Sequence, residues 1–148
     1  MNRCNELLMG MIEEHSDVSL EIDMYINKIP FVMTTSWALH FGTAELIKNE
    51  KISTIMIALT QVIEAYKARG FHIRHILADG QFEHARKHIE QMGIILNITS
   101  HDEHVPEIER FIRTVKERLW AIVNTLPFKQ YPNRLMVETV YNAIFWLN

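Results

Sequence analysis

The sequence contains a single cysteine, Cys4, so no disulfide can form within the chain, and a reducing compartment is its simplest setting. It has no apolar run near the roughly 18 residues that a membrane-spanning helix requires. Glu6, Glu13 and Glu14 interrupt the amino-terminal segment, which therefore lacks the apolar stretch of a signal peptide. These absences predict a protein of the cytoplasm or nucleus with no membrane partner.

Basic charge is also scarce, because 15 Lys and Arg residues against 18 Asp and Glu residues give a formal net charge of −3. Proteins that bind nucleic acid tightly on their own usually carry a basic balance, so any such contact here needs a local basic strip. The length of 148 residues fits one domain, and a hydrophobic content of 48% is enough to fill its core. No linker rich in proline, glycine or serine divides the chain.

The apolar pattern predicts three strands, then alternating helices and strands. Residues 18–26 place an apolar side chain at every second position, which is typical of a strand with one buried face. Gly70 lies where a helix of period 3.6 would have its C′ glycine, and Pro106 and Pro132 stand at the first turns of two later helices. The predicted strands cover residues 18–26, 29–36, 43–47, 71–78 and 94–99, and the predicted helices cover residues 1–15, 52–66, 82–92, 106–123 and 132–147.

This order, β-β-β-α-β-α-β-α-α after an amino-terminal helix, predicts an α/β fold. Three consecutive strands favour an antiparallel meander, and the later strands favour parallel additions, so we expect a mixed five-stranded sheet flanked by helices. The first and fourth strands should be neighbours. We divide the chain into an amino-terminal helical extension, residues 1–17, and a core domain, residues 18–148.

Three carboxylates could converge in this topology. Asp23 lies in the first strand, Asp79 ends the fourth, and Glu109 lies near the start of the long helix. Two carboxylates about 4 Å apart repel by roughly 4 kcal/mol at an effective dielectric of 20, a cost that a divalent cation removes. Hard oxygen ligands favour Mg²⁺ or Mn²⁺, and a pair of such ions can activate a water or a 3′-hydroxyl during phosphodiester chemistry.

Each carboxylate also has an ordinary interpretation. Asp23 could be a solvated strand residue, and Asp79-Gly80 could be a simple turn. Glu109 could interact with the helix dipole and pair with Arg113. Periodicity and spacing alone leave both interpretations of the triad open.

Longer motifs resemble the integrase core of Copia-type retrotransposons, whose fold belongs to the RNase H-like superfamily. The segment 79–83, Asp-Gly-Gln-Phe-Glu, is similar to the family's segment around its second catalytic Asp, and Glu109-Arg110 with Arg113-Thr114 is similar to the segment around its catalytic Glu. Residues 126–128 and 137–143 resemble the closing helix of that core. The resemblance covers about residues 18–148, and it is closer still to Copia-like elements of diatoms and other algae.

The resemblance implies that Asp23, Asp79 and Glu109 are catalytic metal ligands for Mg²⁺ or Mn²⁺. It also implies that Arg113 and Lys116 contact DNA, although a solvated face of ion pairs fits these two residues equally well. Two departures stand against it: 29 residues separate Asp79 from Glu109, fewer than is usual in the family, and His101-Asp102-Glu103-His104 replaces the usual loop. The family's zinc-binding amino-terminal domain and carboxy-terminal DNA-binding region have no counterpart, so we expect a core alone.

Two other features could form contacts. His84 and His88 have a spacing that can bind a metal, but with no obvious third ligand a surface pair is favoured. The last helix has more apolar surface than a small sheet covers, which favours a homodimer or higher homo-oligomer.

Three functions fit the sequence. The first is a metal-dependent polynucleotidyl transferase that processes and joins DNA ends, which would make the chain an enzyme. The second is a non-catalytic integrase remnant that serves as an interaction or dimerisation module. The third is a structure-selective nuclease of the same fold. Metal binding that depends on Asp79 separates the second from the others, and strand transfer separates the first from the third.

Overall fold

The computed structural model describes residues 9–10, 16–99 and 106–148. Its five strands are β1 (Asp17–Ile26), β2 (Ile29–Ser36), β3 (Phe41–Leu46), β4 (His72–Ala78) and β5 (Ile95–Ile98). Its helices are α2 (Ile52–Lys67), the 3-10 helix η1 (Gly80–Ala85), α3 (Arg86–Gln91), α4 (Pro106–Val123) and α5 (Asn133–Leu147). The predicted helix over residues 1–15 lies outside the described residues, apart from Met9 and Gly10. The division into residues 1–17 and 18–148 stays a prediction.

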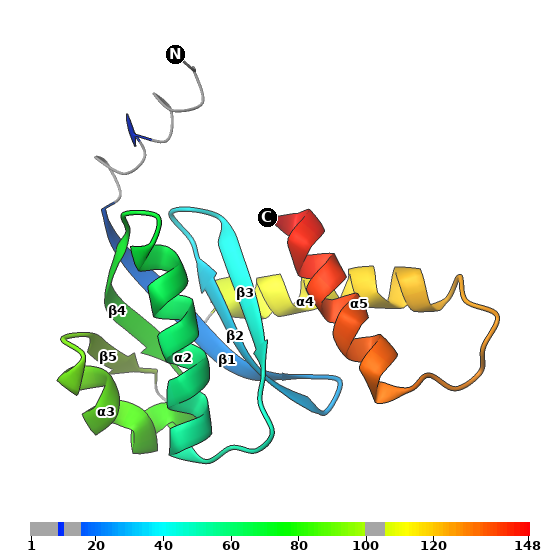
Figure 1. Ribbon diagram of the computed structural model, residues 1–148, viewed down its shortest axis with the longest axis horizontal. Coiled ribbons are helices and arrows are strands. Elements are labelled where there is room, and N and C mark those ends of the chain that lie inside the picture. The colour runs from blue at the N-terminus through cyan, green and yellow to red at the C-terminus, as the bar shows by residue number, and fades with distance from the viewer. Residues whose placement is uncertain (1–8, 11–15, 100–105) are drawn as a thin grey trace.

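The five strands form one mixed sheet in the order β3-β2-β1-β4-β5. β1 pairs antiparallel with β2, and β2 with β3, whereas β1 pairs parallel with β4, and β4 with β5 (Figure 1). The predicted meander followed by parallel additions is therefore confirmed, as is the adjacency of the first and fourth strands. That adjacency brings the carboxyl ends of β1 and β4 to the same edge of the sheet.

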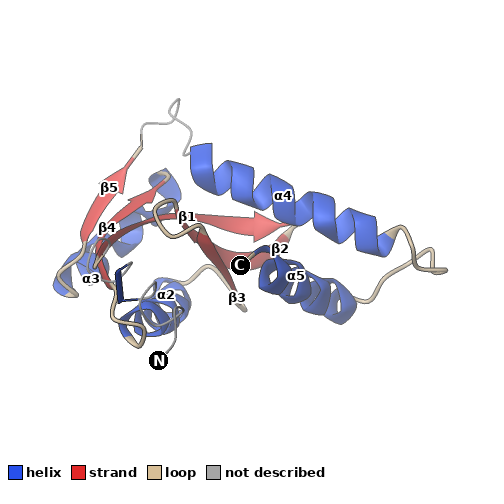
Figure 2. Ribbon diagram, turned by 90° about the horizontal axis from the view of Figure 1, so that it is seen from above, coloured by secondary structure: helices blue, strands red, loops and turns tan. Residues whose placement is uncertain are grey.

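Helices cover both faces of the sheet, and each face has its own core. α2 and α3 pack against one face, around Leu20, Ile22, Ile76 and Leu59. α4 and α5 pack against the other face, where β2 contributes Phe31 and Met33. Figure 2 shows α4 and α2 on opposite sides of the sheet. Among the described residues, no helix has the length and apolar character needed to cross a membrane.

A bulge in β1 moves its last residue to the opposite face. Tyr25 has a φ of 78°, and the register with β2 shifts between Met24 and Ile26. Met24 consequently packs in the core beside α2, whereas Ile26 packs in the core beside α4 and α5. Such a bulge bends a strand and re-aims its side chains. The bulged residue lies two positions after Asp23.

Two predicted elements differ from the structure by more than one residue at an end. The helix predicted over residues 82–92 is divided into η1 and α3, because the Asp79 side chain caps a 3-10 turn by accepting a hydrogen bond from the Gln81 backbone N–H. The third strand begins at Phe41 and ends at Leu46, earlier than the predicted range of 43–47. Gly70 has the left-handed conformation expected after a helix, with a φ of 87°.

Candidate catalytic carboxylate site

Asp23 and Asp79 directly follow the last residues that β1 and β4 pair with each other. The final pair of the β1–β4 ladder joins Ile22 to Ala78. Asp23 comes next within β1, where it pairs with Met33 of β2, and Asp79 comes next after the end of β4. Asp79 keeps an extended backbone, with φ −80° and ψ 175°. Since side chains alternate along a strand, position 79 falls on the same face as Leu77, which packs beside α4 and α5. Ile22 packs on the opposite face, beside α2, so its neighbour Asp23 also falls on the face that α4 and α5 cover.

Gln81 connects the two aspartates. Its backbone N–H donates to Asp79 Oδ1 at 3.1 Å, and its side-chain amide donates to Asp23 Oδ1 at 3.2 Å. Asp23 Oδ1 also accepts the backbone N–H of Met24 at 2.6 Å. The turn that follows β4 therefore holds both carboxylates through one residue.

Three charged side chains act on Asp23. Burial raises the pKa of its carboxyl group, and repulsion from Asp79 and Glu109 raises the pKa further. The hydrogen bond from Met24 and the positive charge of Lys116 lower the pKa. Asp23 thus lies within electrostatic range of Asp79, which follows β4, and of two α4 residues that are seven positions apart. An acidic cluster of this kind favours a cation.

Glu21 ties the start of α4 to β1. Its Oε2 accepts the backbone N–H of Ile108 at 2.8 Å, which satisfies a donor that the first turn of a helix leaves without a partner. Burial raises the pKa of the Glu21 carboxyl, and the N–H groups of Ile108 and Glu107 lower it. Because Glu21 lies two residues before Asp23, the same strand that carries Asp23 also positions the helix that carries Glu109.

The described residues include no group of three or more His, Cys, Asp or Glu side chains that could hold a metal ion as they stand. Asp23 and Asp79 supply the hard oxygen donors that Mg²⁺ and Mn²⁺ prefer, and their repulsion is the cost that such an ion offsets. Glu109, the predicted third ligand, is exposed on the first part of α4. The chemistry of the donor set fits a divalent ion.

The predicted DNA-contact residues lie on the same helix as Glu109. Arg113 is exposed, and Lys116 is partly buried within electrostatic range of Asp23. His84 and His88 are both exposed, and no third ligand joins them within the described part of the chain. Of these residues, Lys116 is the one whose charge acts on Asp23.

Sequence reasoning missed Gln81 and Glu21. The period of two along β1 could have indicated Glu21, because it places residues 21 and 23 on one face. Gln81 follows the turn dipeptide Asp79-Gly80, and only the register between β1 and β4 shows that its side chain reaches Asp23. Glu21 accepts a hydrogen bond from a backbone N–H, and Gln81 donates to two carboxylates. Amino-acid composition cannot predict such contacts.

Comparison with protein-family models and with curated protein sequences finds no match. Comparison with solved structures finds retroviral integrase cores. The catalytic core domain of BIV integrase is 18% identical, with a TM-score of 0.65 over 88% of this chain and 82% of that one. The HTLV-2 integrase catalytic core domain in complex with magnesium matches in a dimeric form, at 15% identity and a TM-score of 0.65 over 90% of this chain and 87% of that one. Its trimeric form matches at 16% identity and a TM-score of 0.62, over 90% and 85% of the two chains.

This likeness extends over most of each chain, and at such low identity it establishes the fold. The chain has the RNase H-like architecture of integrase catalytic cores, with a mixed five-stranded sheet between two layers of helices. The predicted fold class is confirmed. A fold of this kind hosts several chemistries, so function has to be argued from the residues at the site.

Proposed function

We propose that this chain is the metal-dependent polynucleotidyl transferase core of a retrotransposon integrase, of the Copia type that its motifs resemble. The observation that carries the proposal is the placement of Asp23 and Asp79 after the last pair of adjacent parallel strands, with Glu109 in electrostatic range. The magnesium named with the HTLV-2 core supports a divalent ion as the cofactor. Asp23, Asp79 and Glu109 are the proposed ligands.

Each residue has a distinct role in this proposal. When bound, Mg²⁺ or Mn²⁺ would activate a water or a 3′-hydroxyl and stabilise the leaving oxygen of a phosphodiester. Gln81 holds the Asp23 carboxylate toward the end of β4, and Glu21 holds the start of α4. Lys116 and Arg113 attract the phosphates of DNA. With a net charge of −3, the isolated core should bind DNA weakly.

The test is a calorimetric titration with Mn²⁺ beside a labelled-oligonucleotide assay. Wild type should bind the ion and join a recessed 3′ end to target DNA, and Asp79→Asn should lose both, because it removes one ligand charge at constant side-chain size. Asp17→Asn is a matched control, since Asp17 pairs with Arg74 at the opposite end of β1. Cleavage without joining would favour a structure-selective nuclease.

A non-catalytic remnant is the second candidate, because the described residues hold no ready group of three metal ligands. It predicts that Mn²⁺ binding is absent, or that it survives Asp79→Asn unchanged. In that case the short spacing between Asp79 and Glu109 would have removed the chemistry while the fold and its surfaces remained.

We also propose that the chain forms a homodimer or higher homo-oligomer through α5. Phe145 and Trp146 are 73% and 74% exposed and pack edge to face with their ring centroids 5.6 Å apart. Exposed aromatic pairs of this size are typical of contact surfaces. Trp146→Glu should shift the sedimentation coefficient toward the monomer. Ile57→Glu places the same charge at an exposed position on α2 and should leave the sedimentation coefficient unaltered. A shift in Ile57→Glu but not in Trp146→Glu would place the interface on α2.

A further inference from the structure

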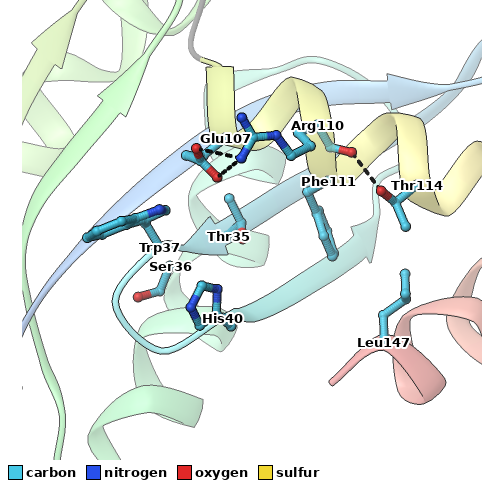
Figure 3. Close-up of a pocket in the computed structure, with 9 residues that line it drawn as sticks. All are labelled: Thr35, Ser36, Trp37, His40, Glu107, Arg110, Phe111, Thr114 and Leu147. Atoms are coloured by element: carbon cyan, nitrogen blue, oxygen red, sulfur yellow. Dashed lines mark hydrogen bonds and ion pairs between the residues drawn. The ribbon is translucent and has the colours of Figure 1, made fainter.

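A hollow separate from the carboxylates lies between α4 and the turn that joins β2 to β3. It has a volume of about 170 Å³, and Figure 3 shows Trp37 and His40 on one side of it, with Arg110 and Phe111 on the other. Leu147 reaches its rim from α5. Ligand pockets usually measure about 300–1,000 Å³, so this one has room for a single ring system rather than a larger ligand.

Helix geometry separates this hollow from the proposed catalytic site. Each residue turns an α-helix by about 100°, so Glu109 and Lys116 share one flank of α4. Glu107 and Thr114, which line the hollow, lie about 160° and 140° around the axis from Glu109 and share the other flank. The two flanks face different surroundings: Asp23 on one side and the β2–β3 turn on the other.

The turn presents Trp37 as an open aromatic surface. The indole is 62% exposed, and its ring lies 6.5 Å from that of His40 at an angle of 58°, so the two rings do not cover each other. Two hydrogen bonds close the turn, from the Leu39 N–H to Ser36 Oγ and from the His40 N–H to the Trp37 carbonyl, both at 3.4 Å. An exposed aromatic ring is the kind of surface on which unpaired bases stack.

The opposite wall carries an anchored cation. Arg110 Nη1 donates to both carboxylate oxygens of Glu107, at 3.1 and 3.3 Å. The arginine side chain is 69% exposed and the glutamate 26%, so the positive group is the outer member of the pair. Among the described residues, these bonds use one guanidinium nitrogen, which leaves Nε and Nη2 as donors toward an anion.

We propose that this hollow binds one unpaired nucleotide of a single-stranded nucleic acid, with the base on Trp37 and the adjoining phosphate on Arg110. A bare anion fits less well because Glu107 repels it, and an uncharged ring leaves the outer donors of Arg110 unused. A nucleotide supplies both a flat ring and an adjacent negative charge. The site needs none of the proposed metal ligands and so extends beyond the proposed integrase activity.

The test uses thymidine 5′-monophosphate and a short single-stranded thymidine oligonucleotide. The chain has three tryptophans and therefore three indole N–H signals in a nitrogen-correlated NMR spectrum. The signal that is missing in Trp37→Phe is that of Trp37. Thymidine 5′-monophosphate should shift the Trp37 signal and leave those of Trp120 and Trp146 in place. Deoxyribose 5-phosphate, which lacks the base, should shift it little. Equal shifts with both compounds would overturn the stacking contact.

Fluorescence anisotropy of the labelled oligonucleotide gives the affinity. Trp37→Ala should weaken binding about five- to 140-fold, as expected for the loss of one stacked base, and Trp37→Phe should recover most of the affinity. Arg110→Ala should lower the slope of binding against salt by about 0.7. Phe128→Ala, which removes an exposed ring in the loop between α4 and α5 outside the hollow, should bind as wild type does. Loss of binding in Asp79→Asn but not in Trp37→Ala would place the strand at the carboxylates and refute the proposal.

Discussion

Gln81 donates its side-chain amide to Asp23 at 3.2 Å, just beyond the last residues that β1 and β4 pair with each other. Its backbone N–H donates to Asp79 at 3.1 Å in the same turn. One residue of the 3-10 helix η1 thus contacts a carboxylate within β1 and the carboxylate that follows β4. The relationship depends on the parallel register, which sets residues 22 and 78 side by side.

Gln81→Ala should weaken Mn²⁺ binding by about tenfold, because hydrogen-bond partners of metal ligands typically contribute ten- to 100-fold to affinity. A carboxylate oxygen has more than one lone pair, so the amide and an ion can share Asp23. Calorimetric titration measures the change. Gln91→Ala, at an exposed position that ends α3, is the control and should bind as wild type does. Tighter binding in Gln81→Ala would show that the amide competes with the ion.

Glu21→Ala should destabilise the fold by about 1 kcal/mol, the usual effect of losing a side-chain acceptor at a helix start. The lost contact is the 2.8 Å hydrogen bond from the Ile108 N–H. Urea unfolding measures the free energy. Glu21→Gln keeps an acceptor oxygen and lacks the buried charge whose desolvation raises the pKa of Glu21, so it should lose less. Equal losses in the two variants would mean that the charge, rather than the hydrogen bond, holds α4.

The contrast between Met24 and Ile26 shows how far the sequence could predict the fold. Burial imposes a period of two on strands and 3.6 on helices, so the order of elements and the adjacency of β1 and β4 followed from the apolar pattern. The alternation runs unbroken through residue 26, yet Met24 and Ile26 pack in different cores, because Tyr25 adopts a positive φ. The apolar pattern therefore does not predict that bulge.

The same limit applies to the sites. The predicted topology singled out Asp23, Asp79 and Glu109, and the motif resemblance implied their catalytic role, which stays a prediction. The connection through Gln81 depends on backbone register. The hollow beside Trp37 joins residues far apart in the chain, which local periodicity cannot relate.

Gly42→Ala should destabilise the fold by about 1–3 kcal/mol, as overpacking does. A Cβ at Gly42 would overlap the ring of Phe111, and the glycine is fixed in place by Asn148, which bonds both its N–H and its carbonyl at 2.8 Å. Urea unfolding is again the measurement. Gly80→Ala is the control, since nothing lies within 4 Å of the added atom. Phe111→Leu should relieve part of the loss in a double variant, and additive effects would argue against the overlap.

Glu45→Gln should raise stability at pH 7 and leave it unchanged, or lower it, near pH 4. Burial raises the pKa of Glu45 in the folded chain. A raised pKa means that the folded state binds the proton more tightly than the unfolded state does. Protonation of Glu45 therefore stabilises the fold fully below the unfolded pKa of about 4.3, and this stabilisation is lost as pH rises through the folded pKa. Urea unfolding at both pH values tests this. Glu138→Gln, exposed on α5, reports the effect of removing one surface charge. Equal gains at both pH values would contradict the prediction.

Lys116→Ala should weaken DNA binding and lower its salt dependence by about 0.9 on a logarithmic plot, the effect of one phosphate contact. Lys116 is partly buried and lowers the pKa of Asp23, so its charge lies near the carboxylates where a phosphate would arrive. Arg113→Ala should have a similar effect on duplex DNA. Lys67→Ala, exposed at the end of α2, is the control for the loss of a positive charge. Binding is measured by anisotropy at several salt concentrations. A salt slope unchanged in Lys116→Ala would favour the interpretation of this helix as a solvated face, because its cations would then be pairing with Glu107 and other acidic neighbours rather than with DNA.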